Sequence, residues 1–146
     1  MEFRYKPLEV KPSKSVNRKM VVWRPIIPVY LFNNKKVIGY EAIIDSGADF
    51  NIFHSEIADI LGLNYKKGKK RHLFGLGYQE IKGYECEATI KIQGFGKYTA
   101  QIVFSSQIPP NSFAVLGNKG FFDHYSVNFK YNQRIIIINP ALKNLN

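Results

Sequence analysis

The chain has 146 residues, 45% hydrophobic and 14% aromatic, and a formal net charge of +10 at pH 7. This size and composition are typical of one globular domain and exclude a largely disordered chain. No window approaches the roughly 18 consecutive apolar residues of a membrane span, and the N-terminal residues lack the apolar run of a signal peptide. We therefore expect a cytoplasmic protein without a membrane partner.

The N-terminal segment differs from the rest of the chain. Residues 1–22 are basic and interrupted by prolines, which predicts a partly disordered arm ahead of a domain at residues 23–146. From there strand signals dominate. Apolar runs at 26–32 and 37–45, separated by the turn sequence Asn-Asn-Lys-Lys, predict a hairpin that ends at Asp45.

The next segment, residues 54–63, is the best helix candidate. Ser55 is a suitable N-cap, and Gly62 is a suitable C-terminal stop. Ile57, Ile60 and Leu61 would share one apolar face of this helix.

The downstream half alternates apolar and polar residues with a period of two, which predicts half-buried strands. The expected inward residues are Tyr84, Cys86, Ala88, Ile90 and Ile92 in one strand, and Tyr98, Ala100, Ile102 and Phe104 in the next. A short strand at 113–117, one or two helical turns at 118–125, and a strand, turn and strand over 125–140 complete the chain. Many short strands with few helices predict an all-β barrel or sandwich.

Few residues offer catalytic chemistry. The three histidines and Cys86 are scattered without zinc-type spacing, so we expect no metal and no cofactor. Cys86 lies on the apolar face of its strand, which favours a buried thiol over a nucleophile. No nucleophile elbow or Walker-type phosphate loop is present.

Asp45 is the exception, because it follows an apolar strand directly. A carboxylate there is costly to desolvate unless it is paired, hydrogen-bonded or protonated, although Asp-Ser-Gly is also ordinary turn chemistry. The wider pattern is Ile43-Ile44-Asp45-Ser46-Gly47-Ala48, with Asn51 between Phe50 and Ile52. It resembles the active-site motif of the retropepsin-like (retroviral-type) aspartic proteases.

Two further features resemble this family in the right order, and the resemblance spans residues 26–139. A glycine-containing hairpin at 72–84 corresponds to the flap, with the tip at Gly75, Leu76, Gly77, Tyr78 and Gln79; a plain surface hairpin is the alternative. Leu116 and Gly117 correspond to the apolar residue and glycine that precede a C-terminal helix. Many relatives then carry Arg or Asp, where this chain has Asn118 and Lys119.

The resemblance implies an all-β acid-protease barrel with one or two short helices, assembled as a two-fold homodimer. It implies an aspartic endopeptidase that acts on an extended peptide, with Asp45 catalytic and Ser46, Gly47 and Ala48 in the active-site loop. Asp49, Asp59 and Asp123 lack the Ser-Gly that follows Asp45. The second catalytic Asp45 would therefore come from a second copy. Without a hydroxyl at Ala48 to stabilise the ionised carboxylate, we expect the pair to work nearer neutral pH than a digestive acid protease.

Two alternatives remain open. One keeps the fold without the activity, as a dimerisation or peptide-binding module. The other is a basic β-barrel that binds nucleic acid through Lys66 to Arg71, with Tyr65 and Phe74 available for stacking; it is the less favoured. The same basic segment is also typical of a solvated loop.

Overall fold

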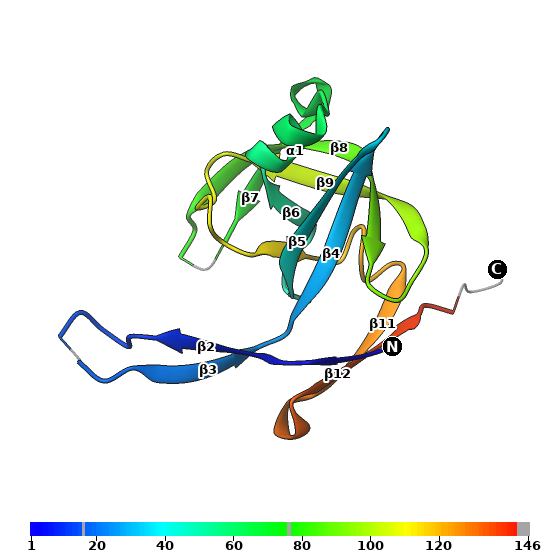
Figure 1. Cartoon of the computed structure of the whole chain (residues 1–146). Helices are drawn as coiled ribbons and strands as arrows, with labels where there is room; N and C mark the ends of the chain where they lie inside the picture. The colour runs from blue at the N-terminus through cyan, green and yellow to red at the C-terminus, as the bar shows by residue number, and fades with distance from the viewer. Residues whose placement is uncertain (16, 76, 143–146) are drawn as a thin grey trace.

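The computed structural model describes residues 1–15, 17–75 and 77–142, which are mostly β-strand (Figure 1). The strands are β1 (Glu2–Arg4), β2 (Lys6–Val10), β3 (Met20–Arg24), β4 (Ile26–Asn33), β5 (Lys36–Ile44), β6 (Asn51–His54), β7 (Lys69–Phe74), β8 (Glu80–Ile92), β9 (Lys97–Ser105), β10 (Ala114–Leu116), β11 (Tyr125–Lys130) and β12 (Ile135–Pro140). Helix α1 (Ser55–Leu61) and the 3₁₀ helices η1 (Tyr65–Lys67) and η2 (Tyr131–Gln133) complete the elements. In the ranges described, none of the helices has the length and apolar composition needed to span a bilayer.

The main sheet closes into a barrel. Its strand order is β4-β5-β10-β6-β9-β8-β7, and β4 also pairs with β8, so six strands form the closed part and β7 extends from β8 outside it. The two predicted hairpins are confirmed as β4–β5 and β8–β9, both antiparallel. The expected all-β barrel is therefore observed.

Strand β10 lies between two strands that follow one another in sequence. It pairs in parallel with β5 and antiparallel with β6, so the connection from β5 to β6, residues 45–50, passes around its end. This topology brings Leu116 beside Ile44 in the sheet. The chain around residue 117 is thereby placed against the Asp45 loop.

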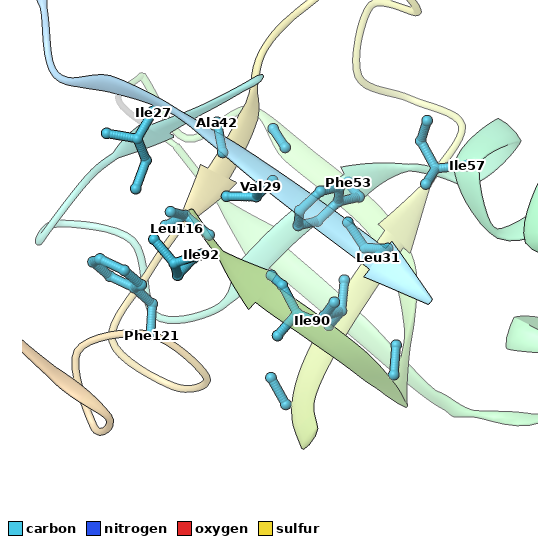
Figure 2. Close-up of a cluster of buried hydrophobic side chains, with 14 of the residues drawn as sticks. Ile27, Val29, Leu31, Ala42, Phe53, Ile57, Ile90, Ile92, Leu116 and Phe121 are labelled. Atoms are coloured by element: carbon cyan, nitrogen blue, oxygen red, sulfur yellow. The ribbon is translucent and has the colours of Figure 1, made fainter. Parts of the chain in front are cut away.

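The core fills the barrel with side chains from every barrel strand and from α1 (Figure 2). Ile27, Val29 and Leu31 of β4 are fully buried and alternate with more exposed neighbours, as a period of two requires. The inward faces predicted for β8 and β9 are confirmed, with Tyr84, Cys86 and Tyr98 half-buried and the other members buried. The predicted alternation fails at Glu85, which is buried rather than exposed.

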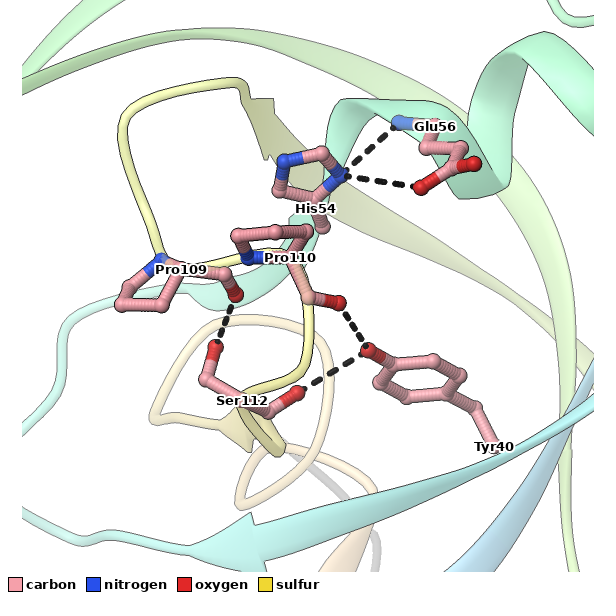
Figure 3. Close-up of polar contacts among 6 residues, drawn as sticks. All are labelled: Tyr40, His54, Glu56, Pro109, Pro110 and Ser112. Carbon is pink, nitrogen blue, oxygen red and sulfur yellow. Dashed lines mark hydrogen bonds and ion pairs between the residues drawn. The ribbon is translucent and has the colours of Figure 1, made fainter.

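Helix α1 lies where the sequence predicted it, but its N-cap residue differs from the predicted one. His54, not Ser55, is the N-cap, because its Nδ1 accepts a hydrogen bond of 3.2 Å from the Glu56 N–H (Figure 3). Gly62 ends the helix in the left-handed conformation, as expected. Ile60 is 53% exposed, so it lies outside the buried face.

The segment after Gly117 also differs from the expectation. Residues 118–124 form turns rather than a helix. Gly120 N–H donates to the Asp123 carboxylate at 3.0 Å, and Tyr125 N–H donates to the Phe121 carbonyl at 2.9 Å. Phe121 is fully buried, so the turns serve to place this ring in the core.

The N-terminal segment forms strands, which differs from the expected partly disordered arm. Strand β1 pairs with β12, so the first residues and residues 135–137 lie side by side. Strands β2 and β3 form a hairpin that extends away from the barrel (Figure 1). The Lys6 ammonium lies 2.6 Å from the Glu41 carboxylate of β5 and fixes the base of this hairpin. A division into arm and domain at residue 22 stays a prediction.

The loop between β9 and β10 is attached to β5, the strand that leads into Asp45. The Tyr40 hydroxyl donates to the Ser112 carbonyl at 2.9 Å and approaches the Pro110 carbonyl at 3.5 Å (Figure 3). The Ser112 hydroxyl donates to the Pro109 carbonyl at 2.7 Å, which closes the loop on itself. The loop is thus held against β5.

Candidate active site

Asp45 is the first residue after β5, and its side chain is exposed although Ala42 and Ile44, at the end of that strand, are buried. Its backbone N–H donates to the Leu116 carbonyl at 3.0 Å, which continues the β5–β10 ladder by one bond. The Gly47 N–H donates to Asp45 Oδ1 at 2.9 Å, and the Ala48 N–H donates to the Asp45 carbonyl at 3.2 Å. The turn chemistry of Ser46-Gly47 therefore orients the carboxylate instead of merely reversing the chain.

The loop is held from the other side by the residues after β10. Asn118 N–H donates to the Ala48 carbonyl at 2.8 Å, and Lys119 N–H donates to the Asp49 carbonyl at 2.9 Å. Gly117, the residue before Asn118, is buried against the backbone of Ala48 and Phe50. A Cβ at this position would lie 2.3 Å from the Phe50 carbonyl oxygen and 2.7 Å from that of Ala48. Only glycine permits this approach of two backbone segments.

Asn51 has a positioning role that the sequence did not reveal. Its side chain is fully buried, and its Oδ1 accepts a 3.0 Å hydrogen bond from the Gly117 N–H. Within the described ranges its Nδ2 has no hydrogen-bond partner, which costs free energy in a buried amide. In the sequence, the one sign of this role is that Asn51 is a polar residue between apolar neighbours at the start of β6. Its partner was not visible, because Gly117 is 66 residues away.

Asp45 lines a groove of about 640 Å³ together with the base of the predicted flap. One wall comes from the loop after β5, with Gly47, Ala48 and Asp49, and the opposite wall comes from β7, with His72, Leu73 and Phe74. The remaining lining residues are Phe50, Ile52, Gly75, Ile81 and Val115. The groove is therefore mostly apolar, with two carboxylates on one side. Asp49 was not assigned to it from the sequence.

The predicted flap is a hairpin of β7 and β8, with its tip at residues 75–79. Gly75 N–H donates to the Gln79 carbonyl at 3.2 Å, and Tyr78 N–H donates to the Gly75 carbonyl at 3.1 Å. Gly77 and Tyr78 both have positive φ, and the Tyr78 side chain is 90% exposed. Leu76, also predicted for the tip, lies outside the described residues. Of the described tip residues, Gly75 lines the groove.

An ion cluster around the buried Glu85 connects the flap to the Asp45 loop. Glu85 of β8 is 7% exposed and accepts hydrogen bonds from the Arg71 guanidinium of β7 and, at 2.9 Å, from the Lys119 ammonium. Both cations also lie over the Phe50 ring, at 5.0 Å and 5.7 Å from its centroid. Glu85 is thus buried on the outer side of its strand because these cations cover it. Lys119, one of the two departures from the family pattern, supplies this contact.

Replacing Glu85 by glutamine is expected to lower the free energy of unfolding by about 1–3 kcal/mol near pH 7. Burial raises the pKa of Glu85, but hydrogen bonds and charges from Lys119 and Arg71 together hold that pKa below its ordinary value. A carboxylate with a lowered pKa stabilises the fold above its unfolded pKa, and this contribution is lost as the pH falls through its folded pKa. Urea unfolding should therefore show a wide gap between wild type and E85Q near pH 7 and a narrower gap near pH 3.

The control for this experiment is Glu87→Gln, which alters an exposed carboxylate on the same strand. It should unfold like wild type near pH 7. Protein concentration is held constant throughout, because association changes apparent stability. A gap for E85Q that does not depend on pH would contradict the role given to the charge of Glu85.

The structure corrects the stacking role expected for Tyr65 and supports the expectation for Cys86. Tyr65 is 7% exposed and packs against Phe104 at 5.9 Å between ring centroids, so it has no free face for a base. Burial raises the pKa of the Cys86 thiol, which disfavours the nucleophilic thiolate. In the part of the chain that the structure describes, no three His, Cys, Asp or Glu side chains gather as metal ligands.

No protein-family model and no curated protein matches the sequence. Among solved structures, a retropepsin-like aspartic protease from Rickettsia conorii is similar, with a TM-score of 0.55 and 16% identity over 78% of this chain and 96% of that one. The EIAV protease complexed with the inhibitor HBY-793 has a TM-score of 0.48 and 18% identity over 73% of this chain and 88% of that one. With the strand order described above, the similarity to the Rickettsia structure establishes that this chain has the retropepsin-like barrel fold.

Proposed function

We propose that the chain is one half of an aspartic endopeptidase, in which Asp45 from each of two copies forms the catalytic pair. The observation that carries this proposal is the position of Asp45, oriented by Gly47 N–H and exposed at the side of a 640 Å³ groove. An exposed carboxylate fixed by the backbone of two loops is suited to act on a bound molecule. The retropepsin-like fold supports the same assignment.

The proposed reaction uses one water and one shared proton. Two carboxylates in contact cannot both be ionised, so one is ionised and the other protonated. The ionised Asp45 takes a proton from water, and the water oxygen forms a bond to the peptide carbonyl carbon. At the same time the protonated Asp45 gives its proton to the carbonyl oxygen. The first Asp45 then gives the proton that it took from water to the peptide nitrogen as the C–N bond breaks, and one hydroxyl of the intermediate returns its proton to the second Asp45. The two products are a carboxylic acid and an amine.

The groove is suited to an extended peptide. Apolar walls from Leu73, Phe74 and Val115 would contact side chains on either side of the cut bond. The glycines of the flap tip leave room for the flap to move as a peptide enters, and Tyr78 would contact the peptide or the second copy.

Specific activity is expected to fall on dilution, because a single chain contributes only one Asp45 to the pair. Cleavage of a fluorogenic peptide, measured over a dilution series, should lose specific activity in the same range in which sedimentation shows the dimer dissociating. Constant specific activity for a protein that sediments as a monomer would contradict the shared site. It would favour chemistry carried out within one chain.

The pH optimum of cleavage is expected to lie above about pH 4. Ala48 carries no hydroxyl, and within the described chain the hydrogen bond to the Asp45 carboxylate comes from the Gly47 N–H. Less stabilisation of the ionised form favours a working range nearer neutral pH. A pH–rate profile that peaks below this value would contradict the role given to Ala48, without affecting that of Asp45.

A fold without activity is the second candidate, as a dimerisation or peptide-binding module. The same assays separate the two. A dimer that binds peptides but cleaves none across the pH range would favour the inactive module.

A further inference from the structure

A second cavity, of about 470 Å³, lies beside the groove on the flap. It is formed by η1, β7, β8 and the end of β9. Five basic side chains line it: Lys66, Lys70, Arg71, His72 and Lys82. Among the described residues that line it, none is acidic, although the chain carries eleven acidic residues in all. The cavity therefore combines a concave shape with one sign of charge, which concentrates anions.

Part of the positive charge of the cavity is compensated by carboxylates of residues that do not line it. Arg71 is paired with the buried Glu85. His72 contacts Glu80, and the Lys82 ammonium lies 4.0 Å from the same carboxylate. These three side chains are thus partly neutralised and oriented by acidic neighbours.

Lys66 and Lys70 hold the uncompensated charge. In the ranges that the structure describes, neither forms an ion pair, and both side chains are exposed. The Lys66 ammonium lies 5.9 Å from the centroid of the Tyr65 ring, which directs it across the cavity wall rather than toward a carboxylate. Two free ammonium groups are therefore available to an anionic ligand.

The cavity and the groove are neighbours along one strand. His72 lines both, Phe74 lines the groove and Lys70 lines the cavity. Lys70, His72 and Phe74 lie on the same, more exposed face of β7. Four residues of strand span about 13 Å, so a peptide extended along β7 covers the distance from Phe74 to Lys70 in about four residues.

We propose that this cavity is an anionic subsite for the substrate: it binds an acidic side chain of a peptide about four residues from the residue that contacts Phe74. The inference rests on the proposed function only in taking a peptide as the occupant of the groove. It adds a substrate class, namely peptides with Asp or Glu displaced from the cut bond. The carboxylate would accept hydrogen bonds from Lys66 and Lys70.

A nucleic acid fits the same charges less well. Stacking needs an exposed aromatic face. Of the three aromatic side chains in the cavity wall, Tyr65 and Phe104 are buried, at 7% and 0% exposure, and Tyr84 is half-buried and packs edge-on against Tyr65. Phe74 is exposed, but it lies at the groove. A pocket with two free ammonium groups is better suited to one or two carboxylates than to a continuous phosphate backbone.

The test measures binding without requiring cleavage. The full-length Asp45→Asn variant is titrated with two fluorescent peptides that share one apolar core and differ in carrying Glu or Gln at three to five residues to either side of it. We expect the Glu peptide to bind about fivefold to tenfold more tightly at low salt, and the ratio to fall toward one near 1 M salt. Adding Lys66→Gln and Lys70→Gln should remove most of this ratio.

The matched control removes two lysines from the β2–β3 hairpin, Lys11→Gln and Lys14→Gln, so the net charge changes equally. It should keep the ratio. Equal binding of the Glu and Gln peptides, or an equal loss in the control, would overturn the proposal. So would a single-stranded oligonucleotide that binds more tightly than the Glu peptide and loses affinity with Lys66→Gln and Lys70→Gln. Because binding is the measurement, absence of cleavage by wild type would count against the proposed function and not against this subsite.

Discussion

Replacing Asp45 by asparagine is expected to lower peptide cleavage by about 10³-fold or more, with the dimer retained. Asparagine has nearly the same shape and can still accept the hydrogen bond from Gly47 N–H on its side-chain oxygen. It cannot take a proton from water or hold the shared proton. The measurement is cleavage of a fluorogenic peptide by wild type and D45N, with sedimentation and thermal unfolding recorded for both.

Two further variants make this result specific. Asp59→Asn alters an exposed carboxylate on α1, away from the groove, and should cleave like wild type. Mixed dimers of wild type and D45N should be inactive as well, because each contains only one Asp45. Undiminished cleavage by D45N would contradict the catalytic assignment. Equal loss in Asp49→Asn, with mixed dimers of wild type and D45N that keep half of the activity, would instead indicate a pair within one chain.

Replacing Gly117 by alanine is expected to lower the free energy of unfolding by about 3 kcal/mol or more and to abolish cleavage. The new Cβ would lie 2.3 Å from the Phe50 carbonyl oxygen and 2.7 Å from the Phe50 carbonyl carbon and the Ala48 carbonyl oxygen. These are backbone atoms, so a change of side-chain rotamer cannot relieve the overlap. The loop after β5 would have to separate from β10, which removes the support of Asp45.

The matched control for this prediction is Gly96→Ala. Gly96 lies in the turn between β8 and β9, and a Cβ there meets no atom within 4 Å. This variant should unfold within about 0.5 kcal/mol of wild type and keep its activity. Urea unfolding of both variants is the measurement. A Gly117→Ala protein as stable and active as wild type would show that the close contact of the two loops is not required.

Much of the fold followed from local patterns in the sequence. The alternation in β8 and β9 fixed which residues face the core, because a strand places successive side chains on opposite faces. The turn sequence between residues 32 and 37 predicted the β4–β5 hairpin, and the Asp45 motif identified the loop that the structure places at the groove. These features depend on residues that are close together in the chain, so they can be predicted from a single sequence.

Local reasoning failed for the N-cap of α1 and for the segment after Gly117. Ser55 is a good N-cap by type, but His54 takes the position. The residues after Gly117 form turns rather than a helix, and Asp123 and Phe121 are used inside those turns. The intrinsic preference of a residue for a helix or a cap position is weak in short segments, and the surrounding structure overrides it.

The sequence by itself determined the order of the strands from residue 26 onward, the alternating faces of β8 and β9, and the single Asp-Ser-Gly loop per chain. Only the tertiary structure decided which strands are neighbours, and hence that β10 lies between β5 and β6 and that Gly117 supports the Asp45 loop. It also decided that Glu85 is buried, because the covering cations come from β7 and from residue 119. Contacts between residues far apart in sequence are selected by the packing of the whole barrel, which no local pattern encodes.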